Sequence, residues 1–187
     1  MTLRLRTANP GDAEKIASLH ADSWRRHYRG AYADSYLDGD IVPDRLSVWA
    51  SRLAAPLGGS ATILAEDEHA AGLAGFAHAV FDVDARWGSL VDNLHVSFDR
   101  QRAGVGTALL ARAAQDVAEQ AKREPIYLWV LQQNTAAQDF YRAMGGACVE
   151  ELPVLPPGGV PSRLNGRPRK LRFAWTDAAA LVGATGR

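Results

Sequence analysis

Short apolar and alternating runs along the chain predict seven strands. Leu3 and Leu5 alternate with Arg4 and Arg6, which is the two-residue period of a half-buried strand. Ile126 to Leu131 is continuously apolar, as in a strand that is covered on both faces. The predicted strands lie at 3–6, 61–65, 72–83, 89–96, 126–131, 147–152 and 170–175.

Helical periodicity and helix-start signals predict the intervening helices. Asn9 as N-cap, with Pro10 at the first helical position, begins a helix that continues to about Gly30. Asn134 stands where the N-cap of a later helix belongs, and Gly145 supplies its C-terminal stop. The other predicted helices span 33–37, 44–53 and 105–121. Proline and glycine fill 153–161, which we expect to be an irregular loop.

This order of elements predicts an α/β fold with helices on both faces of a mixed sheet. The early strands are joined by turns and should be antiparallel, whereas the two helical crossovers place parallel strands in the middle. We expect one domain over residues 1–175 and a tail over 176–187 that frays after Asp177.

Composition excludes several classes of protein. The formal net charge is zero over 187 residues, so no overall field attracts nucleic acid or an anionic membrane surface. The one cysteine, Cys148, cannot form an internal disulfide, and its strand-like surroundings predict a small buried thiol. Neither a signal-peptide pattern nor an apolar run long enough to span a membrane occurs, so we expect a cytoplasmic protein.

The segment 101–107, Gln-Arg-Ala-Gly-Val-Gly-Thr, predicts an anion site because it joins a strand to a helix. The first backbone N–H groups of a helix have no partner within the helix, and the helix dipole adds positive charge there. Gly104 and Gly106 remove the Cβ atoms that would keep a phosphate away from the backbone. A P-loop is excluded because Thr107-Ala108 follows the glycine, and Leu109 stands where a dinucleotide fingerprint needs a third glycine.

Together with a second block, this loop resembles the GCN5-related N-acetyltransferase (GNAT) superfamily. The second block is the strand that ends at Leu131, followed by Asn134, Phe140-Tyr141 and Gly145-Gly146. The segment 24–38, with Trp24, Tyr28 and Gly30, is also similar to that of many bacterial members. The resemblance covers roughly residues 3–175. It implies a GNAT-like sheet whose fourth and fifth strands splay apart, with a β-bulge on the fourth.

The resemblance also implies acetyl-CoA as co-substrate, no metal, and direct transfer of the acetyl group to a primary amine. The backbone of the fourth strand would pair with the pantetheine arm, and the glycine loop would bind the pyrophosphate. The expected coenzyme-binding residues are Leu94, His95, Val96, Gln101, Arg102, Ala103, Gly104, Val105, Gly106, Thr107, Asn134 and Tyr141. Asn134 either contacts the pantetheine arm or caps its helix, and the two roles are compatible.

Tyr141 matches the usual general acid of the family. Attack of an amine on a thioester gives an oxyanion that collapses and expels a thiolate, and a phenol within hydrogen-bond reach can stabilise or protonate the leaving sulfur. The alternative is that Tyr141 only packs beside Phe140. A backbone N–H near the bulge, that of Val96, would meet the oxyanion.

The general base departs from the family pattern. Many members place a glutamate where this chain has Leu90, so Asp92, two residues further along the strand, is the candidate base. Asp92 could equally be a solvated or substrate-positioning carboxylate. The missing glutamate raises an alternative, an acyl-CoA-binding module with little or no catalysis. A third reading, an NAD-dependent Rossmann enzyme, conflicts with Leu109.

The acceptor is a primary amine of a small molecule or peptide, and the sequence does not choose between them. Trp24 and Tyr28 are candidate acceptor contacts, although an aromatic stripe at helical spacing is more often core. The basic residues of 163–172 are either a solvated strand edge or contacts for an acidic acceptor or the 3′-phosphate of the coenzyme. Family members often form homodimers, which the resemblance makes an expectation here.

Overall fold

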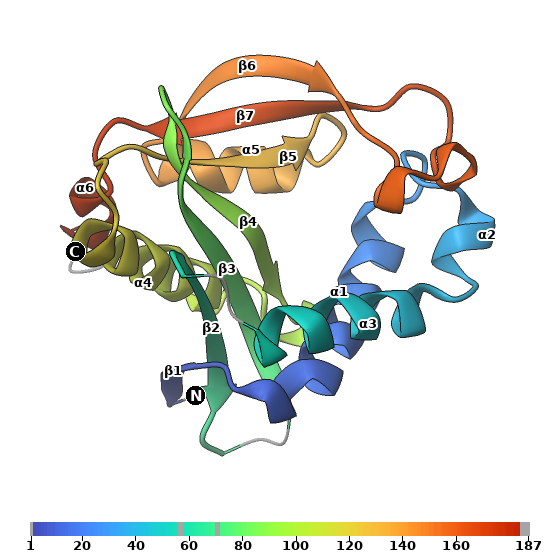
Figure 1. Cartoon of the computed structure of the whole chain (residues 1–187), viewed down its shortest axis with the longest axis horizontal. Helices are drawn as coiled ribbons and strands as arrows, with labels where there is room; N and C mark the ends of the chain where they lie inside the picture. The colour runs from blue at the N-terminus through green and yellow to red at the C-terminus, as the bar shows by residue number, and fades with distance from the viewer. Residues whose placement is uncertain (1, 56–57, 70–71, 184–187) are drawn as a thin grey trace.

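One mixed sheet organises the part of the chain that the computed structural model describes, which comprises residues 2–55, 58–69 and 72–183. The sheet has seven strands in the order β1-β2-β3-β4-β5-β7-β6 (Figure 1). The strands are β1 (Leu3–Thr7), β2 (Ser60–Asp67), β3 (Leu73–Asp84), β4 (Gly88–Val96), β5 (Ile126–Leu131), β6 (Ala147–Pro153) and β7 (Arg169–Trp175). All neighbouring pairs are antiparallel except β4 and β5, which are parallel.

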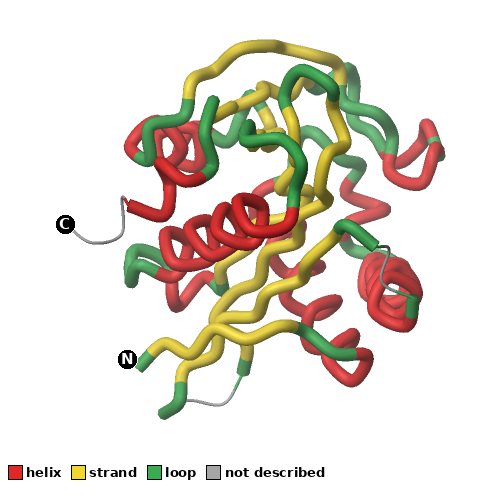
Figure 2. The backbone as a smooth tube through the Cα atoms, turned by 60° about the vertical axis from the view of Figure 1, so that its left-hand side comes forward, coloured by secondary structure: helices red, strands yellow, loops and turns green. Residues whose placement is uncertain are grey.

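Helices cover both faces of this sheet (Figure 2). The helices are α1 (Ala13–His27), α2 (Asp34–Leu37), α3 (Ile41–Ala54), α4 (Val105–Gln120), α5 (Thr135–Ala143) and α6 (Ala179–Gly183). Successive side chains of β2 point to opposite faces of the sheet. Ile63 and Ala65 pack in the core beneath α4, whereas Leu64 packs with α1 and α3 on the other face. The strand therefore buries both faces, as its apolar sequence predicts.

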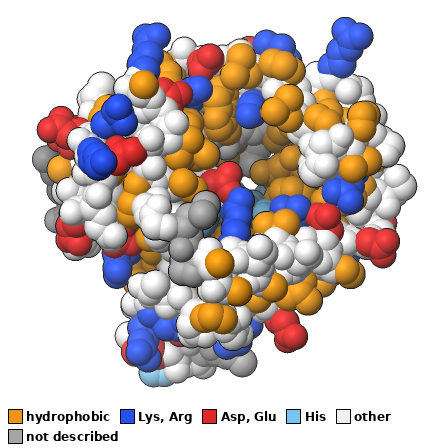
Figure 3. All heavy atoms as spheres, viewed as in Figure 1, with side chains coloured by type: hydrophobic (Ala, Val, Ile, Leu, Met, Phe, Trp, Pro, Cys, Tyr) orange, Lys and Arg blue, Asp and Glu red, His pale blue; other side chains and the backbone are white. Residues whose placement is uncertain are grey.

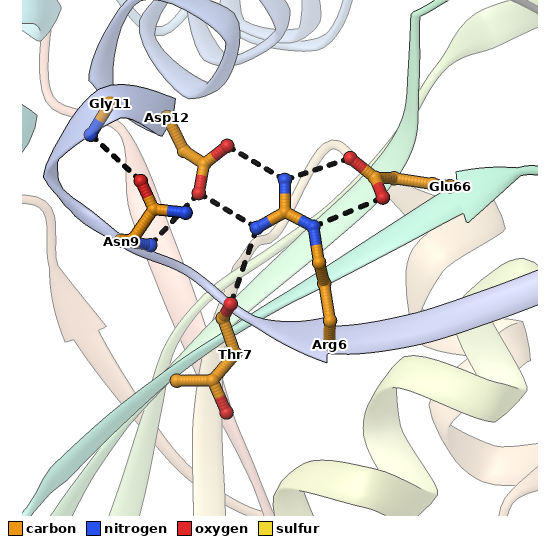
Figure 4. Close-up of polar contacts among 6 residues, drawn as sticks. All are labelled: Arg6, Thr7, Asn9, Gly11, Asp12 and Glu66. Atoms are coloured by element: carbon orange, nitrogen blue, oxygen red, sulfur yellow. Dashed lines mark hydrogen bonds and ion pairs between the residues drawn. The ribbon is translucent and has the colours of Figure 1, made fainter.

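An arginine on the first strand ties three segments together near the N-terminus (Figure 4). Arg6 donates two hydrogen bonds to Asp12, at 2.7 and 2.8 Å, and two to Glu66 of β2, at 2.8 and 3.0 Å. Asp12 also accepts from the backbone N–H of Asn9 in a capping box at the start of the helical region. Arg6 lowers the pKa of both carboxyls, and Asp12 is buried.

Replacing Arg6 with methionine is expected to lower the free energy of unfolding by about 2–3 kcal/mol at neutral pH, because Asp12 would stay buried without its cation. The pKa of Asp12 is lower in the folded state than its ordinary value of 3.8. The ion pair therefore stabilises the fold fully above about pH 3.8, and this stabilisation is lost as the pH falls through the folded-state pKa. Urea unfolding at several pH values measures this effect. Arg4→Met, an exposed change on the same strand, is the control, and equal losses in the two variants would contradict the prediction.

The middle of the sheet opens as the resemblance implied. β4 and β5, both fully described, pair only from Ser89 with Ile126 to Val91 with Leu128, and they separate beyond these residues. On its other side β4 loses register with β3, because Asn93 pairs with His78 and Val91 with Ala79. Asp92 is thus the extra residue of a β-bulge, so both the splayed pair and the bulge are confirmed.

Four local predictions need correction. Helix α3 begins at Ile41 rather than Asp44, since a proline such as Pro43 is tolerated in the first helical turn. The proline-rich loop contains two short 3₁₀ turns, at 157–159 and 161–163. The tail does not fray directly after Asp177, because α6 buries Leu181 in the core with α4, and residues 184–187 lie outside the described part. Cys148 is exposed, since β6 is an edge strand.

Candidate active site

A cavity of about 490 Å³ lies where β4 and β5 diverge. Figure 3, which views the molecule as in Figure 1, shows a hollow near the middle, with hydrophobic side chains around it and acidic and basic groups beside it. Five segments line the cavity: α1, β4, the glycine loop with the start of α4, β5, and α5. The residues that line it include Ser23, Tyr28, Asp92, Leu94, His95, Val96, Gln101, Arg102, Gly104, Gly106, Thr107, Trp129, Asn134 and Tyr141.

The pairing of β4 with β3 decides which backbone groups face this cavity. The Ser97 N–H donates to the Ala74 carbonyl at 2.9 Å. Hydrogen-bonded positions alternate along an antiparallel pair, so the backbone groups of His95 face β3, whereas those of Leu94 and Val96 face the side that β5 has left. Of the three predicted residues, Leu94 and Val96 therefore have backbone groups available to a ligand in the gap.

The backbone of the glycine loop passes through the left-handed region at two residues. Arg102 and Gly104 have φ angles of +62° and +82°, both in the left-handed region. A Cβ atom on Gly104 would meet no atom within 4 Å, and one on Gly106 would lie 3.4 Å from Phe140. Helix α4 starts at Val105, so its first N–H groups open onto the cavity.

The loop residues divide according to where their side chains lie. Gln101, Arg102 and Thr107 line the cavity with Gly104 and Gly106. Ala103 is exposed outside the lining, and the side chain of Val105 is buried in the core. Only the backbone N–H groups of these two residues are therefore candidates for phosphate binding.

Tyr141 lies on α5 with its ring buried and its cavity-side edge at the lining. Its ring packs against Phe140, Phe173 and Trp175, with centroids 5.3–6.3 Å apart. Burial raises the pKa of the Tyr141 hydroxyl above its ordinary value of 10.0, with a smaller contribution from Tyr28. The phenol consequently keeps its proton at neutral pH, which a hydrogen-bond donor to a leaving thiolate requires.

Asn134 fulfils the capping role and lies at the cavity. Its Oδ1 accepts from the Ala137 N–H at 3.2 Å, which fixes the start of α5. Asn134 also lines the cavity, so the capping role and a contact with a ligand there are compatible. The same helix presents Tyr141 nearly two turns later, so the cap helps to position the phenol.

Asp92 projects from the bulge and is held by its neighbours. The Arg52 guanidinium of α3 forms an ion pair with it at 2.8 Å, and the Asn93 side-chain amide donates to the same carboxylate at 2.8 Å. Asp92 is exposed and lines the cavity, so the predicted carboxylate does reach the site despite Leu90. Its partner Arg52 could not be inferred from sequence, because 40 positions separate the two.

Two polar residues that contact the predicted His95, Ser23 and His20, were missed from the sequence. The Ser23 hydroxyl and the Nδ1 atom of His95 are 2.8 Å apart, and both residues line the cavity. The buried His20 packs against His95 with ring centroids 4.6 Å apart and accepts from the Trp49 indole N–H at 3.0 Å. Burial lowers the pKa of His95 to about 3, so its ring is neutral at physiological pH.

The structure brings Tyr28 to the cavity but not Trp24. Tyr28 lines the cavity, and burial together with the charge of Asp92 raises its pKa to about 12. Trp24 is buried beneath it, stacked on the Tyr28 ring at 5.2 Å and capped by the Arg45 guanidinium at 4.4 Å. Trp24 is thus part of the α1–α2 core and lies behind Tyr28 rather than at the cavity.

The basic cluster of 163–172 is mostly paired. Arg163 contacts Asp44, Arg169 contacts Glu151, and Arg172 contacts Asp84 and Glu150. Within the described ranges no group of histidine, cysteine and acidic residues could hold a metal ion. Across those ranges, too, no helix has the length and apolar character needed to cross a bilayer.

Comparisons with known proteins agree with this geometry. The family described as "Acetyltransferase (GNAT) family" matches residues 15–145. The uncharacterized N-acetyltransferase YuaI of Bacillus subtilis (strain 168) is 29% identical over 149 residues, which cover 79% of this chain and 82% of YuaI. The PaiA N-acetyltransferase of Thermoplasma acidophilum, solved with coenzyme A, has a similar fold: TM-score 0.71, 16% identity, and coverage of 94% of this chain and 100% of that one. YncA of Salmonella typhimurium, a structure with acetyl-CoA, gives a TM-score of 0.66 at 18% identity and 94% coverage of both chains.

Proposed function

The chain belongs to the GNAT acetyltransferase family, and from this premise we propose how its residues divide the work of transferring an acetyl group from acetyl-CoA to a primary amine. The acetyltransferase class and the acetyl-CoA co-substrate predicted from the sequence are those of the family. The observation that carries the proposal is the open gap between β4 and β5, with the glycine loop at one end and Tyr141 at its wall.

The coenzyme would lie along this gap. The N–H groups at the start of α4 would bind the pyrophosphate, aided by the left-handed turn at Gly104. The pantetheine arm would add hydrogen bonds to the outward backbone groups of Leu94 and to the Val96 carbonyl, as a short extra strand. The chemistry of the donor set fits, because the loop offers backbone N–H groups without a side chain at Gly104 or Gly106 to obstruct them.

The acetyl group would be transferred in the gap between β4 and β5. The neutral amine attacks the thioester carbonyl carbon, and the Val96 N–H stabilises the negative charge that develops on the carbonyl oxygen. As the C–S bond breaks, the Tyr141 hydroxyl donates its hydrogen bond to the departing sulfur. Tyr28 and Asp92 would form the wall for the acceptor, whereas Trp24 would hold the Tyr28 ring in place by stacking against it.

This proposal is tested first by measuring acetyl-CoA binding and then by measuring turnover. Isothermal titration with acetyl-CoA should show micromolar binding, and NAD, the control, should not bind. Release of free thiol in the presence of a panel of small-molecule and peptide amines then measures transfer. Binding with no thiol release for any amine would favour the alternative of an acyl-CoA-binding module, and no binding would overturn the proposal.

Replacing Asp92 with asparagine tests the general base. If Asp92 relays the proton from the amine, turnover should fall by about tenfold or more at pH 7 and recover as pH approaches the pKa of the acceptor amine, where neutral amine is already abundant. The rate is measured as kcat/KM from pH 6 to 10. A constant ratio of wild-type to variant rates across this range would assign Asp92 a positioning role instead.

Three finer properties stay predictions of the sequence. The acceptor is a small-molecule or peptide amine, the chain is expected to act in the cytoplasm without nucleic acid or membrane partners, and a homodimer is expected. Size-exclusion chromatography with light scattering checks the last of these.

A further inference from the structure

Lys170 differs from the other lysines of the chain in its surroundings. The chain has three lysines, Lys15, Lys122 and Lys170, among its 21 basic residues. Lys15 and Lys122 are exposed, whereas Lys170 is partly buried. In the described part of the chain, Lys170 has no carboxylate within ion-pair distance.

The amine of Lys170 lies against the wall of the candidate active site. Lys170 is on β7 opposite Leu131 of β5, and its Nζ atom is 4.4 Å from the ring centroid of Trp129. Trp129 lines the cavity. The carboxylate of Asp92, across the gap between β4 and β5, acts electrostatically on the same amine. Lys170 is therefore on the face where the acceptor is expected.

The surroundings of Lys170 favour its neutral form. Burial lowers the pKa of the Lys170 amine, and the neighbouring charge of Arg172 lowers it further, against opposing effects of Asp92 and Glu150. Only a neutral amine has the lone pair that attacks a thioester. At a given pH, Lys170 consequently has a larger nucleophilic fraction than an exposed lysine.

We propose that Lys170 is a site of self-acetylation, at which the enzyme transfers the acetyl group of its own bound acetyl-CoA to the Lys170 Nζ atom. The inference rests on the proposed function, since it needs acetyl-CoA in the cavity. The Nζ lone pair forms an amide bond to the acetyl carbon, and the C–S bond breaks. Nζ releases one proton, and the coenzyme leaves as a thiol. The product has lost the positive charge that packs on Trp129.

The test follows acetylation of each lysine separately. The full-length protein is incubated with acetyl-CoA and no acceptor, and samples taken over time are digested and analysed by mass spectrometry. Lys15 and Lys122 report uncatalysed acetylation in the same sample. Lys170 should be acetylated more than about tenfold faster than either, because a bound donor acts at high effective concentration. Its rate constant should not change with protein concentration.

Two variants provide the controls. Gly104→Asp, which should lose coenzyme binding, is expected to reduce the Lys170 rate to that of the other two lysines. Lys170→Arg keeps a cation over Trp129 and should remove the fast acetylation while leaving Lys15 and Lys122 unchanged. If the wild-type protein binds acetyl-CoA but all three lysines are acetylated at equal rates, the self-acetylation inference is overturned and the proposed function is not. Absence of acetyl-CoA binding by calorimetry would overturn the proposed function, and the inference with it.

Discussion

Gly104→Asp is expected to weaken coenzyme A binding by about a hundredfold or more, and a side chain at the left-handed φ of +82° should also lower folding stability by about 1–2 kcal/mol. In the proposed binding mode a carboxylate here would face the pyrophosphate of the coenzyme. Two like charges about 4 Å apart near a protein surface repel by a few kcal/mol, and each 1.4 kcal/mol is about a tenfold change in affinity. The cavity around Gly104 offers space, because a Cβ atom there meets nothing within 4 Å. Isothermal titration with coenzyme A measures the loss.

Gly104→Asn separates charge from shape. Asparagine has nearly the size of aspartate and tolerates the left-handed φ of +82° better than most residues, so it imposes a similar backbone cost without the charge. Its affinity should fall by less than about tenfold, and the difference between the two variants should shrink at high salt. Equal losses in both variants at low salt would show that Gly104 serves the turn rather than the phosphate.

The features that the sequence predicted are those encoded by neighbouring residues. The seven strands follow from apolar runs and glycine or proline breaks, and the glycine loop follows from a strand, two glycines and a helix within about 15 residues. The N-cap at Asn134 is equally local. The bulge and the splayed strands came instead from the family resemblance, since no local pattern around Asp92 marks a change of register.

The features that the sequence missed depend on contacts between distant segments. Arg52 and Asp92 meet because α3 crosses the same face of the sheet as the bulge. Trp24 and Tyr28 lie about one helical turn apart on the same side of the helix, so periodicity alone does not predict that only Tyr28 reaches the cavity. Cys148 was expected to be buried because a strand pattern does not say whether the strand lies at the edge of the sheet.

Tyr141→Phe is expected to lower kcat by about a hundredfold, because general acid assistance typically contributes 10² to 10⁴ in rate. The phenylalanine ring can keep the contacts with Phe140, Phe173 and Trp175, so stability and coenzyme affinity should stay near wild type. Since burial raises the pKa of Tyr141, the wild-type rate should not fall on the alkaline side before about pH 10. Steady-state thiol release and thermal unfolding measure these effects.

Changing the leaving group of the acetyl donor shows whether Tyr141 assists departure of the sulfur or only packs. An acetyl donor that departs as a weakly basic anion, such as p-nitrophenyl acetate, needs no hydrogen bond from the phenol, so the defect of Tyr141→Phe should largely disappear with it. Tyr127→Phe is the matched control, because Tyr127 is also buried, lies on β5, and packs against the Arg172 guanidinium 4.5 Å away. It should leave both reactions near wild type. An equal defect of Tyr141→Phe with both donors would assign Tyr141 to packing, and stabilisation of the departing sulfur would then have to come from another group at the cavity.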